Sequence, residues 1–73
     1  MNYLGWEFKD ETITQNPGEG VNIRDCVFYN CRFEINKPSF VYLSNNEYHN
    51  CTFNFDLTGC EGDITIIDDR VVE

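Results

Sequence analysis

A short motif in this chain returns at a fixed distance, and this repetition limits the fold more than any other feature. Asn30-Cys31-Arg32-Phe33 recurs as Asn50-Cys51-Thr52-Phe53, twenty residues later. A related segment, Cys26-Val27-Phe28-Tyr29-Asn30, begins five residues before the first copy. These spacings predict a unit of five residues, with four units in each repeat of twenty. Repeats of this size are typical of solenoids, in which each repeat buries its apolar face against its neighbours.

The five-residue frame also sorts the apolar side chains. Of the twelve residues at every fifth position from 3 to 58, nine are large and apolar, whereas only twelve of the other 48 residues in 1–60 are. Small or β-branched residues stand two places earlier in several units: Val21, Cys26, Cys31, Val41 and Cys51. The frame therefore predicts two inward-facing positions per unit, one large and one small.

Winding the chain at twenty residues per turn places equivalent residues in columns. The expected columns are Tyr3–Ile23–Leu43, Phe8–Phe28–Tyr48, Ile13–Phe33–Phe53 and Gly18–Pro38–Thr58. The last column has no bulky side chain, and its surroundings are rich in turn-forming Asn, Gly, Pro and Asp. Pro38 has no N–H group for a strand ladder, so it must lie at a corner or in a loop. The breaks in the pattern thus align on one side of the predicted coil.

These residues resemble the pentapeptide-repeat family, whose unit has a central Leu or Phe and a small residue two places before it. The best matching units are 21–25, 26–30, 31–35, 41–45, 46–50 and 51–55. The resemblance implies an all-β fold, a short right-handed β-helix with square coils of twenty residues. The family favours Asp or Asn directly before the central residue, and only Asn2 and Asn22 follow that preference here.

The chain is expected to form a single domain over residues 1–73, with repeat-like coils in 1–59. The frame is lost after Gly59, and 60–73 is predicted to be a C-terminal strand or cap, with 63–69 as the strand. The alternative fold is a small antiparallel β meander with strands near 6–14, 21–35, 40–43, 47–57 and 63–67. In that alternative, period-two alternation would account for the apolar residues of 31–35 and 53–57.

The charge of the chain excludes several classes of partner. Thirteen carboxylates against five Lys and Arg give a net charge of −8 and an isoelectric point near 4.3. Such a surface opposes direct binding to nucleic acid or to anionic membranes. Residues 1–7 contain neither a basic stretch nor an apolar run of signal-peptide length. We therefore expect a complete small reading frame located in the cytoplasm, the host cytoplasm if phage-encoded, with reduced cysteines.

Catalytic and metal-binding patterns do not emerge from the sequence, so no enzyme activity and no cofactor is expected. His49 is the only histidine, and the frame points it outward while Cys51 points inward. The cysteines are spaced by five, twenty and nine residues, whereas zinc sites usually bring two cysteines within two to four residues. Nor does any segment match a calcium-binding or a phosphate-binding loop.

The charge suggests a function by its density. A coil of 73 residues with a rise of about 4.8 Å per turn is about 17 Å long. Its net charge is then about one per 2.2 Å, close to the one per 1.7 Å of duplex DNA. The size and charge also resemble phage anti-CRISPR proteins, in particular a type I-C inhibitor with a pentapeptide-like fold. That resemblance implies a small acidic inhibitor that binds a DNA-binding subunit of a CRISPR effector complex and blocks target DNA by mimicry or occlusion.

The candidate partner-binding residues are acidic side chains and two apolar residues expected to stack and point outward from the coil. They are Asp25, Glu34, Glu47, Asp68, Asp69, Ile35 and Phe55. Tyr29, Phe40 and Tyr42 also fall on outward positions of the frame. The alternatives are a structural or adaptor module that binds a protein through this apolar strip, and a DNA mimic of the kind that binds gyrase. The expected oligomeric state is a monomer or a weak dimer.

Overall fold

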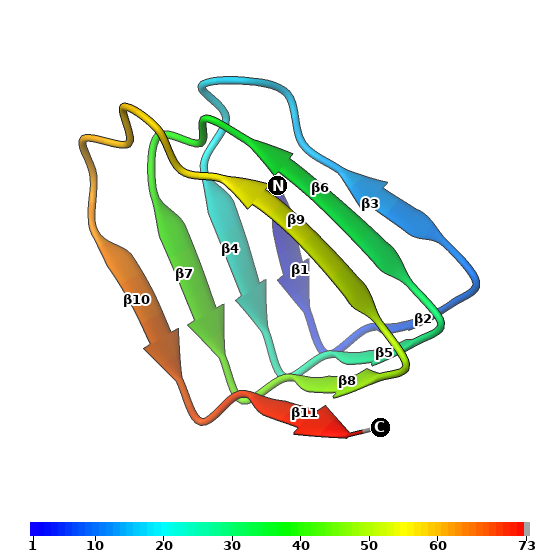
Figure 1. The fold of residues 1–73 in the computed structure, drawn as a ribbon. Coiled ribbons are helices and arrows are strands. Elements are labelled where there is room, and N and C mark those ends of the chain that lie inside the picture. The colour runs from blue at the N-terminus through cyan, green and yellow to red at the C-terminus, as the bar shows by residue number, and fades with distance from the viewer. Residues whose placement is uncertain (73) are drawn as a thin grey trace.

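The computed structural model describes residues 1–72 as eleven short strands (Figure 1). No helix occurs in this range, and therefore none that could cross a membrane. The strands are β1 (Asn2–Leu4), β2 (Glu7–Lys9), β3 (Thr12–Thr14), β4 (Val21–Arg24), β5 (Val27–Tyr29), β6 (Arg32–Asn36), β7 (Val41–Ser44), β8 (Glu47–His49), β9 (Thr52–Asp56), β10 (Ile64–Ile67) and β11 (Arg70–Val72).

The strands form three parallel sheets, which we call A, B and C. Sheet A has the order β1-β4-β7-β10, sheet B has β2-β5-β8-β11, and sheet C has β3-β6-β9. Three turns add one strand to each sheet and a fourth adds one to sheets A and B, so the molecule is a β-solenoid of about four turns (Figure 1). This result confirms the predicted β-helix. The antiparallel meander is wrong, since every strand pair among the described residues is parallel.

The register between turns confirms three of the predicted columns. Ile23 pairs with Tyr3 and Leu43, Phe28 with Phe8 and Tyr48, and Phe33 with Ile13 and Phe53. The fourth column lies in loops, so each coil has three strands and a turn side.

The last turn is offset by three further residues. Leu43 pairs with Ile66, and Tyr48 pairs with Val71. The loop between β9 and β10 therefore contains three residues more than the loop between β6 and β7. This insertion explains why the five-residue frame is lost after Gly59. The predicted C-terminal strand is present as β10, whereas β11 was not expected.

Two corners of each coil use the left-handed backbone conformation. Residues with positive φ recur at equivalent places in successive turns: Gly5, Asp25, Asn45 and Asp68 between sheets A and B, and Asp10, Asn30 and Asn50 between sheets B and C. Asn, Asp and Gly are the residues that adopt this conformation most readily. The corner positions are therefore occupied by residue types that favour this conformation, and they recur at the same places in successive turns.

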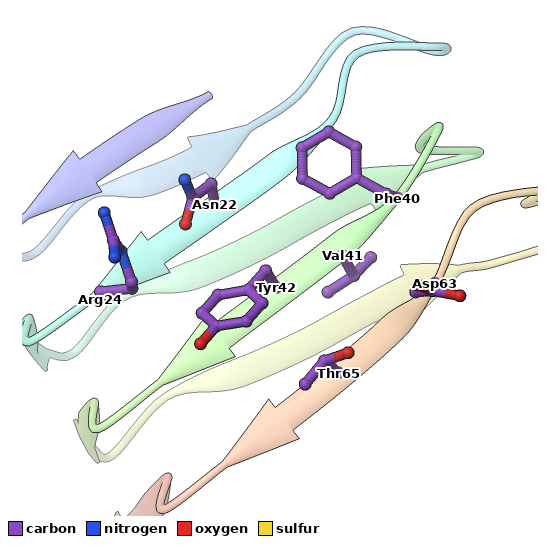
Figure 2. Close-up of a pocket in the computed structure, with 7 residues that line it drawn as sticks. All are labelled: Asn22, Arg24, Phe40, Val41, Tyr42, Asp63 and Thr65. Atoms are coloured by element: carbon purple, nitrogen blue, oxygen red, sulfur yellow. The ribbon is translucent and has the colours of Figure 1, made fainter.

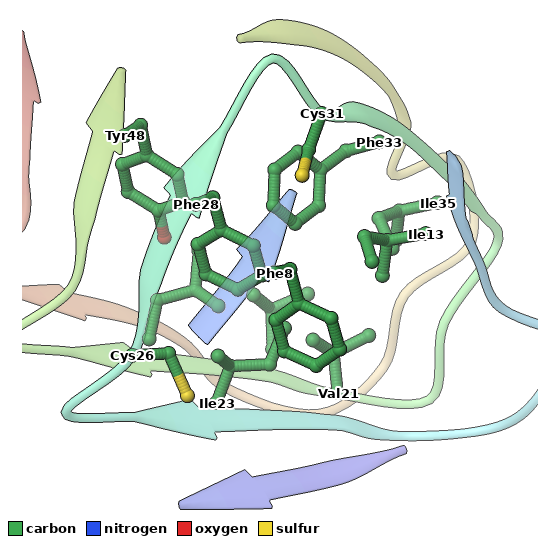
Figure 3. Packing of buried hydrophobic residues seen from close by; sticks show 12 residues of the cluster. Phe8, Ile13, Val21, Ile23, Cys26, Phe28, Cys31, Phe33, Ile35 and Tyr48 are labelled. Atoms are coloured by element: carbon green, nitrogen blue, oxygen red, sulfur yellow. The ribbon is translucent and has the colours of Figure 1, made fainter. Parts of the chain in front are cut away.

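Stacked aromatic rings form the centre of the core (Figure 3). The Phe28 ring is fully buried, with centroids 5.1 Å from Phe8 and 5.3 Å from Tyr48 and with nearly parallel planes. Phe33 meets Phe28 edge to face at 4.8 Å. Such pairs add about 0.5–1.5 kcal/mol each beyond the burial of their apolar area. The register of the turns is thus held by side-chain stacking as well as by the backbone ladder.

One orientation predicted from the sequence is wrong. Ile35 and Phe55 do lie one above the other, but Ile35 is 2% exposed and points into the core, and Phe55 is half-buried against it. The five-residue frame assumes a corner soon after Phe33. Instead β6 continues for five residues, and strand alternation then turns Phe33 and Ile35 to the same inner face. The positive-φ residue that follows is Lys37.

Candidate functional site

The described residues offer no arrangement suited to metal binding. Among residues 1–72, no group of three or more His, Cys, Asp or Glu side chains is close enough to hold a metal ion. The ring of His49 stacks on Tyr29, with centroids 4.7 Å apart, and its Nε2 lies 3.4 Å from Glu47. Cys51 lies on the inner side, and burial raises the pKa of its thiol. The imidazole of His49 and the thiol of Cys51 therefore lie on opposite faces of the coil wall.

A shallow hollow of about 510 Å³ lies on the outer face of sheet A (Figure 2). Its lining residues come from β4, β7, β10 and the loops before them: Asn22, Arg24, Phe40, Val41, Tyr42, Asp63 and Thr65. The Phe40 ring crosses Gly20, where any Cβ would overlap it. Phe40 and Tyr42 thus stand on the outer side, as the sequence predicted. The hollow combines two aromatic rings with one positive side chain, Arg24, and one negative side chain, Asp63. This combination suits a contact surface better than a reaction site.

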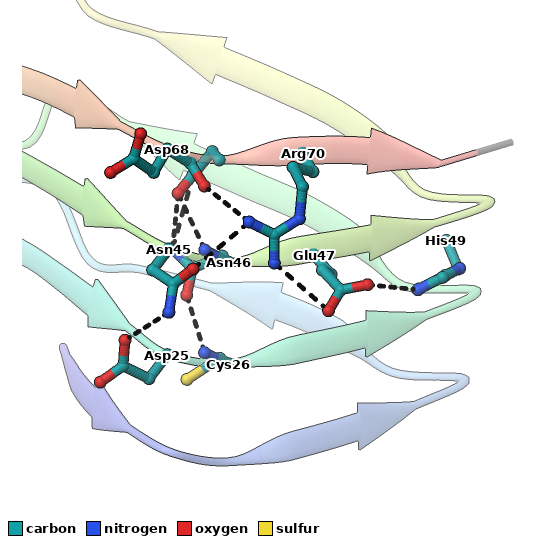
Figure 4. A network of polar contacts seen from close by, with 9 residues as sticks. Asp25, Cys26, Asn45, Asn46, Glu47, His49, Asp68 and Arg70 are labelled. Atoms are coloured by element: carbon teal, nitrogen blue, oxygen red, sulfur yellow. Dashed lines mark hydrogen bonds and ion pairs between the residues drawn. The ribbon is translucent and has the colours of Figure 1, made fainter.

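Two of the candidate acidic residues share a corner of the coil (Figure 4). Asp25 and Asp68 occupy equivalent positive-φ positions between sheets A and B, with Asn45 between them. The Asn45 Nδ2 donates a hydrogen bond of 3.0 Å to Asp25 Oδ1, and Arg70 Nη1 donates one of 3.3 Å to Asn45 Oδ1. This corner is therefore an ordered ladder of carboxylates and amides along the solenoid.

Glu34 and Glu47 lie on different sheets and have different partners. On sheet C, Glu34 accepts hydrogen bonds from Arg32 and, at 2.7 Å, from Asn54 Nδ2, and these contacts lower the pKa of its carboxyl group. On sheet B, Glu47 lies 3.3 Å from Arg70. The acidic residues selected from the sequence are consequently not gathered into one patch.

Asp69 has an internal role that sequence reasoning missed. Its carboxylate accepts hydrogen bonds of 3.0 Å from the Asn46 backbone N–H and 2.7 Å from the Tyr48 hydroxyl. Asn46 is fully buried, and its Oδ1 in turn accepts the Cys26 N–H at 3.0 Å (Figure 4). These contacts close a polar column inside the coil. This role could not be predicted from the five-residue frame, because Asp69 aligns with Asn46 only through the three-residue insertion.

The distribution of ion pairs leaves much of the negative charge uncompensated. Three of the five Lys and Arg residues contact a carboxylate, in the exposed pairs Lys9–Glu7, Arg32–Glu34 and Arg70–Glu47. Within residues 1–72, eight carboxylates have no ion-pair partner: Asp10, Glu11, Asp25, Asp56, Glu61, Asp63, Asp68 and Asp69. Seven of these are exposed. The exposed surface of the described residues thus carries an excess of negative charge.

The two ends of the solenoid differ in how they are covered. At the first turn, the Trp6 indole lies nearly parallel to the Phe8 ring at 5.8 Å and shields it. At the C-terminal end, the last strands of the three sheets expose Phe53, Ile66 and Val71 by 42%, 58% and 66%, although each is in register with a buried residue of the turn before. Nothing in the frame indicated this uncovered apolar end, because the frame stops at Gly59.

Comparison of the chain with protein-family models, with curated proteins and with solved structures finds no match. The class of protein is therefore defined by the fold alone. It is an all-β parallel solenoid with corners of Asn, Asp and Gly, consistent with a pentapeptide-repeat-like β-helix.

Proposed function

We propose that this protein is a small acidic inhibitor that occupies the nucleic-acid-binding surface of a partner protein. The observation that carries the proposal is the excess of unpaired, exposed carboxylates on a regularly stacked β scaffold. A basic groove that receives duplex DNA selects for closely spaced negative charge. An acidic solenoid meets that requirement without carrying any nucleic acid of its own.

The proposed target is a DNA-binding subunit of a CRISPR effector complex. This choice comes from the resemblance of the sequence, in length and charge, to phage anti-CRISPR proteins. Inhibition then requires only that the solenoid cover the surface that target DNA would occupy. A gyrase-type target would use the same chemistry, because gyrase also binds duplex DNA through basic surfaces.

Charge alone does not hold such a complex together. Complementary charges mainly raise the association rate, whereas apolar or aromatic side chains that lose their water at the interface slow dissociation. Phe40 and Tyr42, on the outer face of sheet A, are well placed for this second role beside the carboxylate of Asp63. We therefore include sheet A in the proposed contact surface.

The proposal is tested by affinity capture from a bacterial lysate that contains a type I CRISPR effector and gyrase. Bound proteins are eluted first with short duplex DNA and then with a salt gradient. If the protein is a mimic, short duplex DNA should displace it from a captured DNA-binding partner. Binding of the partner should also weaken steeply with salt, because exposed charges are screened within about 8–10 Å. A captured partner that resists both duplex and salt would contradict the proposal.

A second candidate function is an interaction module that binds a protein through an apolar surface. The exposed apolar end formed by the last turn favours it, since large exposed patches of this kind mark interaction sites. Binding through this end should persist at high salt. The same salt gradient therefore separates the two functions.

A further inference from the structure

Sheet C lacks the fourth strand that sheets A and B possess. The last turn supplies β10 to sheet A and β11 to sheet B, and sheet C ends at β9 (Figure 1). Within residues 1–72, no strand pairs with β9 on the side away from β6. The solenoid therefore has an unfilled strand position beside Thr52–Asp56.

The hydrogen-bonding pattern of the earlier turns defines what this position offers. In sheet C, the N–H groups of Arg32 and Thr52 donate backward, to the preceding turn. The N–H of Gln15, an inward-facing residue in the column of Phe55, donates forward to the carbonyl of Glu34. By this alternation, the N–H groups of Phe53 and Phe55 face the unfilled position.

The side chains at this position are apolar. Phe53 is 42% exposed, and it stacks at 5.3 Å on Phe33 only from the side of the preceding turn. Phe55 lies next to it at a centroid distance of 6.1 Å. An added strand would lay its own inward residues on these two rings, as each turn of the solenoid does for the one before.

The charge of β9 and of the segment that follows it selects the partner. From residue 56 to residue 72 the chain carries five carboxylates and one arginine. Asp56 lies on the outward face at the end of β9. Its carboxylate accepts hydrogen bonds from Thr58, and these lower the pKa of the carboxyl group. A second copy of this chain would bring the same acidic residues against them. A basic segment is complementary.

We propose that β9 is a docking site for an extended, basic segment of a partner protein, which adds to sheet C as a parallel strand. Its inward residues are apolar and cover Phe53 and Phe55, and its outward residues include Lys or Arg beside Asp56. Main-chain hydrogen bonds to the β9 edge hold the segment, and the two rings set its register. This site goes beyond the proposed inhibitor function, because it needs neither a nucleic-acid-binding partner nor the outer faces of sheets A and B.

The test uses the whole protein and a short peptide in which isoleucine alternates with lysine. Peptide is added to about 1 mM, which detects binding with a Kd as weak as about 1 mM, while backbone amide signals are followed by NMR. We expect the largest shifts at Phe53 and Phe55, and about tenfold slower hydrogen exchange of their amides. A peptide with glutamate in place of lysine should bind at least about tenfold more weakly.

A pair of variants separates main-chain pairing from apolar contact. Phe53→Ala and Phe53→Pro both remove the ring, but only proline removes the forward-facing N–H, and it leaves the ladder to β6 intact. Phe53→Pro should bind the lysine peptide at least about threefold more weakly than Phe53→Ala. Equal binding by the two, no shift at Phe53 and Phe55, or a concentration-dependent dimer formed through these residues would overturn the proposal. Loss of duplex competition in the capture experiment would leave this result unchanged, so the two proposals fail separately.

Discussion

The Tyr48 hydroxyl donates a hydrogen bond of 2.7 Å to the Oδ2 of Asp69, which lies 21 residues further along the chain. Burial, and then the neighbouring carboxylate of Asp69, raise the pKa of Tyr48 well above its usual range. The same carboxylate accepts the Asn46 N–H from the turn below. The Asp69 side chain thus links the last, partly uncovered turn to the core. Replacing Asp69 therefore tests how much this link contributes to stability.

Replacing Asp69 with asparagine should destabilise the protein by about 1–3 kcal/mol. The neutral amide keeps only one of the two oxygens that now accept from the Asn46 N–H and the Tyr48 hydroxyl, and losing a hydrogen bond to a charged group costs about that amount. Urea denaturation followed by circular dichroism measures the change. Asp68→Asn is the matched control, since Asp68 is exposed and asparagine tolerates its positive φ. Equal losses in the two variants would contradict the role given to Asp69.

The loss of stability on replacing a stacked aromatic ring should depend on how deeply that ring is buried in the coil. Phe28→Leu removes ring contacts on both sides of a fully buried residue and should cost about 1–3 kcal/mol. Phe53→Leu, in a ring that is 42% exposed and stacked on one side, should cost less than about 1 kcal/mol. The urea midpoints of the two variants provide the comparison. A larger loss for Phe53→Leu would indicate that the open edge of sheet C is covered by another chain in solution.

The acid stability of the protein should depend on Glu34. Its hydrogen bonds with Arg32 and Asn54 lower its pKa below the ordinary value of 4.5. A carboxyl group with a lowered pKa stabilises the folded state above that ordinary value, and the contribution is lost as the pH falls through the folded pKa. The midpoint of thermal unfolding, measured between pH 6 and pH 3, should therefore fall less in Glu34→Gln than in the unaltered protein. An identical decline in both would contradict this assignment.

Reversing two surface charges tests the proposed contact with a basic partner. Glu34→Lys with Glu47→Lys should reduce capture of the target at low salt, with only a small fall in melting temperature from the loss of two surface ion pairs. As a control, Thr12→Lys with Thr14→Lys adds two lysines on the first strand of sheet C without removing a carboxylate. This control changes the net charge by half as much as the double glutamate reversal does. Capture that is unaffected by the double glutamate reversal at low salt would rule these two carboxylates out.

The repeat was readable from the sequence because the large inward residues keep their spacing over three turns. Columns such as Phe8–Phe28–Tyr48 follow directly from that spacing. The orientation of Ile35 did not follow, because strand length on one side of the coil is set by where a positive-φ corner is tolerated. The place of Asp69 did not follow either, since the loop before β10 shifts the register from twenty to 23 residues. Local periodicity thus predicts the scaffold, and insertions decide which polar side chains turn inward.

The central claim, that this acidic solenoid takes the place of DNA on its partner, is tested most directly by a competition measurement. A purified type I-C effector complex is titrated with labelled target duplex at several concentrations of the protein and at two salt concentrations. Direct competition predicts that the apparent Kd for duplex rises in proportion to the protein concentration, and that the effect fades at the higher salt. A Kd for duplex that is unchanged at every protein concentration would contradict the claim.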